Sequence, residues 1–201
     1  MFPVALTGGI GSGKTTVANL FHELYNIDII CADQVARDVI LLPEVIEAII
    51  NEFGDIVMTN GMIDRKVLRS IISQDTSART WLNDLMHPII RQQIELKLSK
   101  SQSIYTIIDI PLLTTATLTN YPYLEKIISI CASMDTKLDR ITARDNQTKS
   151  QALLMIQSQI SDDERHTFSD FIIKNDGDIS DLIPQINAIH HSILLFLNGT
   201  S

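Results

Sequence analysis

Short runs of apolar residues alternate along the chain with stretches in which apolar residues recur every three or four positions. The short runs lack the polar–apolar alternation of a half-exposed strand, so they are typical of strands buried on both faces. They cover residues 2–7, 27–31, 104–108, 126–131 and 171–173. Amphipathic helices are expected from Lys14 onward and over residues 134–144, 150–159 and 183–197. Strands that alternate with helices predict an α/β fold, a parallel sheet flanked by helices.

A long, mostly helical interval separates the second predicted strand from the third. Its helices are expected over residues 34–42, 43–53, from about 64 onward and over 75–100, with a turn-rich stretch at 58–62. Pro88 lies inside the last helix, and because proline lacks an N–H donor we expect a kink or a restart there. The interval is longer than an ordinary crossover. We therefore expect residues 1–33 and 104–201 to form the core and residues 34–103 an inserted helical subdomain.

Composition and charge narrow the class of protein. The chain has 201 residues, of which 45% are hydrophobic, and this suits one soluble α/β domain with additions. A formal net charge of −8 argues against general binding to nucleic acid, and no apolar run is long enough to span a membrane. The N-terminus enters a strand without a signal-type segment, and Cys31 and Cys131 lack metal-ligand spacing. We expect a cytoplasmic protein with no nucleic-acid or membrane partner, and the pattern favours no particular oligomeric state.

One glycine-rich segment predicts a binding site. Gly8-Gly9-Ile10-Gly11-Ser12-Gly13-Lys14-Thr15 matches the P-loop pattern, and it lies between a predicted strand and a predicted helix. The helix therefore directs its free N–H groups and the positive end of its dipole at an anion. Lys14 is expected to reach the β- and γ-phosphates of a nucleoside triphosphate, and Thr15 to ligate Mg²⁺. The other residues expected at the phosphates are Gly11, Ser12, Gly13 and Thr16.

Two aspartates follow predicted strands at the edge where open α/β sheets bind ligands. Asp33 comes just after the second strand, where a carboxylate accepts a hydroxyl proton or holds a metal. The alternative is an N-cap for a helix that begins near Gln34. Asp109, at the end of the third strand, either assists Mg²⁺ through water or caps a turn before Pro111. Position alone leaves both pairs of alternatives open.

Two arginines at helical spacing are candidates for binding the phosphates of the nucleoside triphosphate that donates the phosphoryl group. Arg140 and Arg144 share one helix face, and Arg165 follows in a polar segment. Together they predict a lid over about residues 140–166 whose guanidinium groups neutralise the transferring phosphoryl group. The alternative is an ordinary solvated charged face.

The inserted region carries cations of its own. Arg65 and Arg69 form a second pair at helical spacing, and His87 lies near the middle of a predicted helix. We expect these three residues to meet the phosphates of an acceptor substrate. For His87, the alternative is a structural role at a capped helix end before Pro88.

Further motifs follow one another along the chain. They are Ala32-Asp33 with Ala36-Arg37, Trp81-Leu82-Asn83 with His87-Pro88, Asp109-Ile110-Pro111-Leu112-Leu113, Arg140 with Arg144, Gln159 with Arg165, and Asn175-Asp176-Gly177. Together with the P-loop, this ordered set resembles the dephospho-CoA kinase family over nearly the whole chain. The set is far more specific than the P-loop alone.

The resemblance implies a P-loop NTPase-type kinase core with a helical CoA-binding insertion and a lid. It also implies transfer of the γ-phosphate of ATP, with Mg²⁺, to the 3′-hydroxyl of the ribose of dephospho-CoA, the last step of coenzyme A biosynthesis. By the same resemblance, Asp33 orients or deprotonates the acceptor hydroxyl, Arg140 lies near the ATP phosphates and Asn175 contacts adenine.

The chain departs from the family pattern in three respects, of which one is a lid region that is poor in cations. Cys31 stands where the family usually has aspartate, and Thr114-Thr115 stands where an aromatic or apolar residue and glutamate usually follow Pro-Leu-Leu. The alternatives are therefore another P-loop nucleotide or metabolite kinase, or an inactive ATP-binding paralogue. A nucleotide-dependent switch would need a guanine-specific element such as Asn-Lys-x-Asp, and the sequence has none after the third predicted strand.

Overall fold

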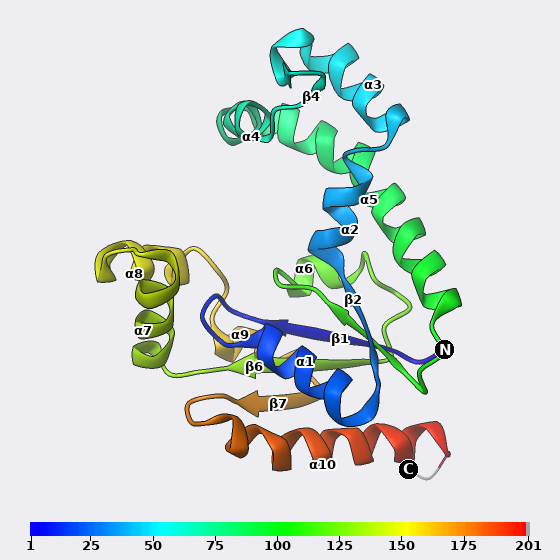
Figure 1. Cartoon of the computed structure of the whole chain (residues 1–201), viewed down its shortest axis with the longest axis vertical. Coiled ribbons are helices and arrows are strands. Elements are labelled where there is room, and N and C mark those ends of the chain that lie inside the picture. The colour runs from blue at the N-terminus through cyan, green and yellow to red at the C-terminus, as the bar shows by residue number, and fades with distance from the viewer. Residues whose placement is uncertain (200–201) are drawn as a thin grey trace. The chain divides into compact units, whose positions relative to one another are not determined.

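The computed structural model describes residues 1–199, and the chain forms two compact units. The sheet unit comprises Met1–Cys31 together with the chain from Lys100 onward, and the helical unit comprises Ala32–Ser99. Figure 1 labels the helices and strands of both units. Within the described residues, no helix is both long enough and apolar enough to cross a membrane.

The sheet unit is built on five parallel strands. In spatial order they are β2 (Asp28–Cys31), β5 (Thr106–Asp109), β1 (Pro3–Gly8), β6 (Lys126–Cys131) and β7 (Phe171–Lys174). Every residue of β1 and β5 is buried, as expected for apolar runs without alternation. The register pairs Asp109 with Leu6 on one side and with Cys31 on the other. The predicted parallel α/β fold is confirmed, and Asp109 is the last residue of its strand.

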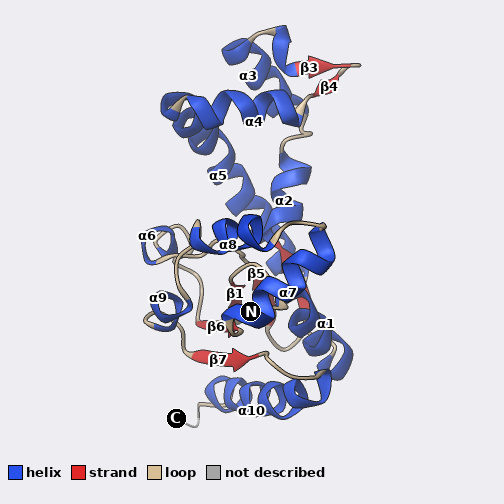
Figure 2. Cartoon of the chain, turned by 90° about the vertical axis from the view of Figure 1, so that its left-hand side faces the viewer, coloured by secondary structure: helices blue, strands red, loops and turns tan. Residues whose placement is uncertain are grey.

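Helices cover both faces of this sheet, with α1 on one side and α9 on the other (Figure 2). The helices of the unit are α1 (Lys14–Tyr25), α6 (Thr115–Leu118), α7 (Met134–Asp145), α8 (Lys149–Gln157), α9 (Asp162–His166) and α10 (Ile179–Leu197). Helix α1 and helix α10 share one hydrophobic core with the central strands, to which Phe21, Ile128 and Ile186 contribute fully buried side chains. Helix α10 begins at Ile179, before the predicted residue 183, and the Asp181 carboxylate in its first turn accepts a hydrogen bond from the N–H group of Asp178.

The helical unit consists of four helices and one small hairpin. Its elements are α2 (Ala32–Val39), α3 (Pro43–Phe53), the 3₁₀ turn η1 (Asp55–Val57), β3 (Met58–Thr59), β4 (Met62–Ile63), α4 (Arg65–Gln74) and α5 (Thr76–Lys100). Asn60 and Gly61 have φ angles of 53° and 78°, which suits the two-residue turn between antiparallel strands. The stretch expected to be a turn is therefore a hairpin. Helix α5 runs through Pro88 without the expected restart, so the loss of one N–H donor does not end it.

Candidate active site

The loop between β1 and α1 has a backbone that requires glycine. Gly11 and Gly13 have φ angles of 77° and 84°, a region that costs a residue with a Cβ about 1–2 kcal/mol. Space is also lacking, because a Cβ at Gly13 would lie 2.1 Å from Nδ2 of Asn175. A Cβ at Gly8 would lie 2.7 Å from Oγ of Ser12. The glycines of the sequence motif thus allow a left-handed, closely packed loop.

This loop presents a set of unpaired backbone donors. Gly13 is the N-cap of α1 and offers no side chain to satisfy the first turn of the helix. In the part of the chain that the structure describes, the N–H groups of Gly11 and of residues 13–16 have no hydrogen-bond acceptor. Free N–H groups at the positive end of a helix dipole form an anion-binding site. The predicted phosphate site therefore has the required backbone geometry.

Lys14 and Asp109 connect the loop to the sheet. The Nζ atom of Lys14 donates a hydrogen bond to Oδ1 of Asp109, and the pair is mostly buried. Asp109 is thus neither a helix cap nor a turn cap. The hydroxyl of Thr15, the next residue along α1, makes no hydrogen bond within residues 1–199. A hydroxyl and a carboxylate of this kind are oxygen ligands that suit Mg²⁺.

Arg140 and Asn175 hold one side of the loop through its carbonyl groups. Asn175 is 5% exposed, and its Nδ2 atom donates to the carbonyl oxygen of Ser12 at 2.7 Å. Arg140 donates from Nη1 to the carbonyl oxygen of Gly11 at 3.3 Å and from Nη2 to Oδ1 of Asn175 at 3.3 Å. Sequence reasoning associated both residues with ATP but missed this contact between them.

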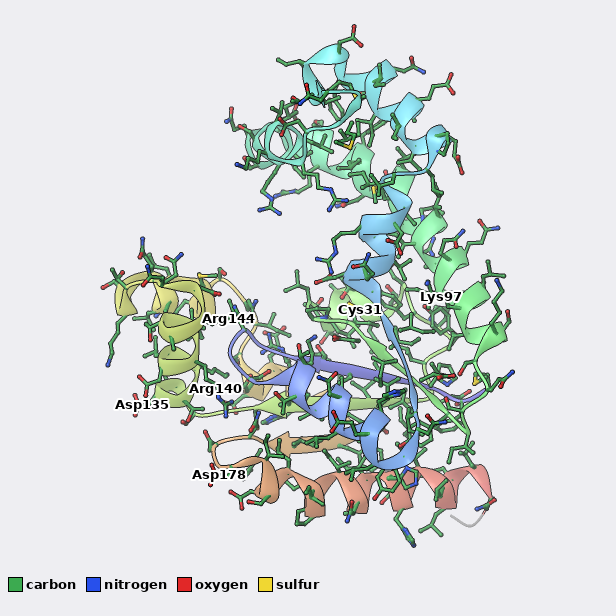
Figure 3. All side chains as sticks on the ribbon, in the orientation of Figure 1. Cys31, Lys97, Asp135, Arg140, Arg144 and Asp178 are labelled. Atoms are coloured by element: carbon green, nitrogen blue, oxygen red, sulfur yellow. The ribbon has the colours of Figure 1, made fainter. Side chains whose placement is uncertain are left out.

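Arg144 lies on α7 with Arg140 (Figure 3) but has a different partner. Its guanidinium group donates two hydrogen bonds to the carboxylate of Asp145, each 2.7 Å long, and its side chain is 63% exposed. The hydrogen bonds that Arg144 donates to the Asp145 carboxylate raise the pKa of Arg144. Among the described residues this arginine makes no hydrogen bond to the loop, whereas Arg140 on the same helix does.

A buried charge cluster lines the other side of the loop. Asp162 accepts hydrogen bonds from Lys137 and from Nη1 of Arg165, the latter at 3.0 Å. Arg165 is 2% exposed, and burial lowers the pKa of its guanidinium group. Together with Gly9 and Gln159, these three residues line a cavity of about 420 Å³. Sequence reasoning placed Arg165 in a mobile lid, and it gave Lys137 and Asp162 no role.

Asp33 is the second residue of α2, in the helical unit. The helix begins at Ala32, earlier than the predicted Gln34, so Asp33 lies in the first turn and is not the N-cap. Its side chain is exposed, and its carboxylate makes no hydrogen bond or ion pair with any described residue. This carboxylate is therefore available to a ligand.

The helical unit has a pocket that brings three predicted substrate residues together. Arg65, Arg69 and His87 line a cavity of about 330 Å³. Arg37, which sequence reasoning noted only as part of a motif, lines it as well, and its carbonyl oxygen accepts a hydrogen bond from Nη2 of Arg65 at 3.1 Å. The apolar residues of the lining are Ala36, Ile40, Leu68, Ile72, Leu82, Met86 and Ile90. A cavity with apolar walls and cationic side chains suits a ligand that has both an apolar part and an anionic part.

The fold and the loop define a P-loop protein of the α/β class that binds nucleoside triphosphates. The model of the family "Dephospho-CoA kinase" matches residues 2–181. A dephospho-CoA kinase of Legionella pneumophila is 39% identical over 196 residues, which cover 96% of each chain. The chain belongs to the dephospho-CoA kinase family. As a member, it is an ATP-dependent kinase that phosphorylates dephospho-CoA in coenzyme A biosynthesis.

Solved structures agree with this assignment. A dephospho-CoA kinase from Campylobacter jejuni is 25% identical, with a TM-score of 0.67 over 99% of this chain and 98% of that one. A protein from Thermus thermophilus has a TM-score of 0.81 at 23% identity, over 95% of this chain and 97% of that one, and it shares the fold. Another P-loop kinase activity, the alternative left open by the sequence, is not favoured.

Proposed function

We propose that the chain transfers the γ-phosphate of ATP to the 3′-hydroxyl of the ribose of dephospho-CoA, with the P-loop as the donor site. The observation that carries this proposal is the set of unpaired N–H groups at Gly11 and residues 13–16, next to the ammonium group of Lys14. Phosphoryl transfer passes through a loose transition state, so positioning and charge neutralisation supply most of the catalysis. The backbone N–H groups position the phosphate oxygens, and Lys14 neutralises their charge.

We assign the Mg²⁺ site to the hydroxyl of Thr15, with Asp109 acting through water. No group of three or more His, Cys, Asp or Glu side chains among the described residues is arranged to hold a metal. This agrees with Mg²⁺, which binds through few protein ligands and takes the rest from substrate phosphates and water. Bound Mg²⁺ supplies positive charge to the β- and γ-phosphate oxygens.

Asp33 is the residue that we propose orients the acceptor hydroxyl and accepts its proton. Its carboxylate is exposed and has no partner among the described residues, so it is free to accept a hydrogen bond from a ribose hydroxyl. It follows Cys31, the last residue of β2, by two positions. We therefore propose that Asp33 fills this role alone, although Cys31 stands where the family usually has another aspartate.

We propose that residues 34–103 bind the CoA moiety. The pocket formed by Arg65, Arg69 and His87 supports this role, because dephospho-CoA combines phosphate groups with a long, largely uncharged chain. On the side of the phosphate donor, we propose that residues 140–166 act as a lid whose end at Gln159, Asp162 and Arg165 stays attached beside the P-loop, and in which Arg140 approaches the ATP phosphates. Arg144 joins it after leaving Asp145, and Asn175 contacts adenine through its backbone, because its amide group is bonded to Ser12 and Arg140.

An acceptor panel tests the proposed function. Purified protein is incubated with ATP, Mg²⁺ and either dephospho-CoA, nucleosides, nucleoside monophosphates or shikimate, and the release of ADP is measured with the phosphorylated product. We expect ADP and CoA to form in equal amounts with dephospho-CoA, and no ADP release with the other acceptors. ATP binding without acceptor-dependent ADP release would identify an inactive paralogue, and turnover of another acceptor would refute the acceptor assignment.

A further inference from the structure

One backbone donor of the P-loop is bonded to a side chain from a distant part of the chain. The N–H group of Ile10 donates a hydrogen bond to Oε1 of Gln159 at 2.9 Å. The N–H group of Ser12 donates to the carbonyl oxygen of Gly9 at 3.1 Å. The donors of the loop therefore fall into two classes: Ile10 and Ser12 hold the loop to the protein, while Gly11 and residues 13–16 remain free among the described residues.

Gln159 is itself held in place by its neighbours. It follows the C-terminus of α8, and its backbone N–H donates to the carbonyl oxygen of Ile156 at 3.2 Å. The segment after it is fixed by the buried ion pairs of Asp162 with Lys137 of α7 and with Arg165 of α9. Breaking such a cluster would leave a buried charge without a partner, so the cluster gives Gln159 a rigid base.

Packing leaves little room for the contact to shift. A Cβ at Gly9 would lie 3.2 Å from Nη1 of Arg165 and 3.4 Å from Oε1 of Gln159, so both side chains lie directly against the loop backbone. On the other side, Asn175 and Arg140 hold the carbonyl groups of Ser12 and Gly11. The loop is thus held from two sides, and Gln159 supplies the side-chain hydrogen bond on the first of them.

We propose that Gln159 is a positioning residue that keeps the free N–H groups of the P-loop aimed at the phosphates of ATP. Without its amide oxygen, the N–H of Ile10 has no protein acceptor and the loop samples other conformations. ATP then binds only to the fraction of molecules with the competent loop, and its apparent dissociation constant rises in inverse proportion to that fraction. The turnover number at saturating ATP changes little, because bound ATP selects the same loop geometry. The inference rests on the proposed role of the P-loop as the ATP site.

The variant Gln159→Met tests the proposal, since methionine has a similar size but no strong acceptor. We expect the Kd of ATP to rise about three- to tenfold, as for the loss of one hydrogen bond, with the Kd of dephospho-CoA and kcat within twofold of the original protein. The matched control is Gln157→Met, because Gln157 lines the same cavity but its side chain makes no hydrogen bond among the described residues. Its Kd for ATP should not change. Titration calorimetry with ATP or dephospho-CoA added singly measures each Kd, and no turnover occurs because the other substrate is absent.

Hydrogen exchange of the Ile10 amide in the nucleotide-free protein gives a second measurement. We expect exchange to become at least about tenfold faster in Gln159→Met, while the Val17 amide, bonded to the carbonyl oxygen of Gly13, keeps its rate. If Gln159→Met does not fold, Gln159→Asn, which withdraws the amide by one methylene, is measured in the same way. A rise in the ATP Kd below threefold, or an equal loss of affinity for both substrates, would overturn the proposal. Failure of the original protein to bind ATP would refute the proposed function instead.

Discussion

The ammonium group of Lys14 and the carboxylate of Asp109 form an ion pair that joins the P-loop to the end of β5. Their side chains are 13% and 11% exposed, so each charge depends on the other for compensation. Any phosphate that reaches Lys14 therefore meets a cation whose side chain is already held by Asp109.

Lys14→Met is expected to reduce both activity and stability. Turnover should fall at least about 100-fold, since the variant lacks the charge that stabilises the transferring phosphoryl oxygens. The free energy of unfolding should fall by about 1–3 kcal/mol, because Asp109 is left without its partner. ADP release and urea denaturation measure the two effects.

The double variant Lys14→Met/Asp109→Asn separates these effects. It removes the uncompensated carboxylate, so stability should recover while activity remains lost. If the double variant were no more stable than Lys14→Met, the ion pair would not be the source of the stability loss.

Asp33→Asn is expected to lower kcat by about 10²–10⁴-fold, the range for removal of a general base. The Kd of ATP should stay within twofold. The control is Asp38→Asn, a change of the same kind on the same helix, where the carboxylate accepts a hydrogen bond from Gln34. Unchanged turnover in Asp33→Asn would remove Asp33 from the mechanism.

Arg69→Ala is expected to raise the KM of dephospho-CoA at least about tenfold, because a charge-assisted contact with phosphate is lost. The KM of ATP should not change. Arg79→Ala provides the comparison, since Arg79 is also an exposed arginine of the helical unit but does not line the pocket. Equal effects of the two substitutions on the KM of dephospho-CoA would argue against a role for the pocket.

Stability should fall as the solution becomes acidic, because of His190. Burial, with a smaller effect from His191, lowers the pKa of His190 below its unfolded value of about 6.5. The imidazole bonds to the hydroxyl of Tyr105 at 2.9 Å and stacks on Tyr25 with ring centroids 3.6 Å apart. Between the unfolded and folded pKa values the unfolded chain binds more protons, so the free energy of unfolding decreases as pH falls through that window.

Urea denaturation between pH 8 and pH 5 measures this effect. His190→Gln should flatten the acid side of the profile. His191→Gln should flatten it less, since His191 is exposed and acts only through its charge. An unchanged slope in His190→Gln would contradict the assignment.

The sequence predicted those features that depend on local pattern. Buried strands such as β1 and β6 are continuous apolar runs, and the P-loop is a contiguous motif, so both could be located without the fold. Arg65, Arg69 and His87 were also predicted as one group, and they line one pocket. Helical spacing explains why Arg65 and Arg69 of α4 share a face, but the position of His87 on α5 beside them depends on how the two helices pack.

Features that depend on which side chains pair in the folded chain could not be predicted. The polar segment with Asp162 and Arg165 was predicted as part of a lid, with a solvated charged face as the alternative. A run of charged residues does not reveal that Asp162 pairs with both Lys137 and Arg165, or that Arg165 is buried. Arg144 was grouped with Arg140 by spacing, but its pairing with the adjacent Asp145 was missed. The sequence also predicted a kink or restart at Pro88, but α5 continues through it.

The contact between Gly13 and Asn175 has an evolutionary consequence. Because Nδ2 of Asn175 fills the space that a Cβ at position 13 would take, the effect of a substitution at either position depends on the residue at the other. A smaller residue at 175 would relieve the collision but leave the cost of a left-handed backbone at 13, about 1–2 kcal/mol. A residue with a Cβ at position 13 is therefore expected only together with a smaller residue at position 175.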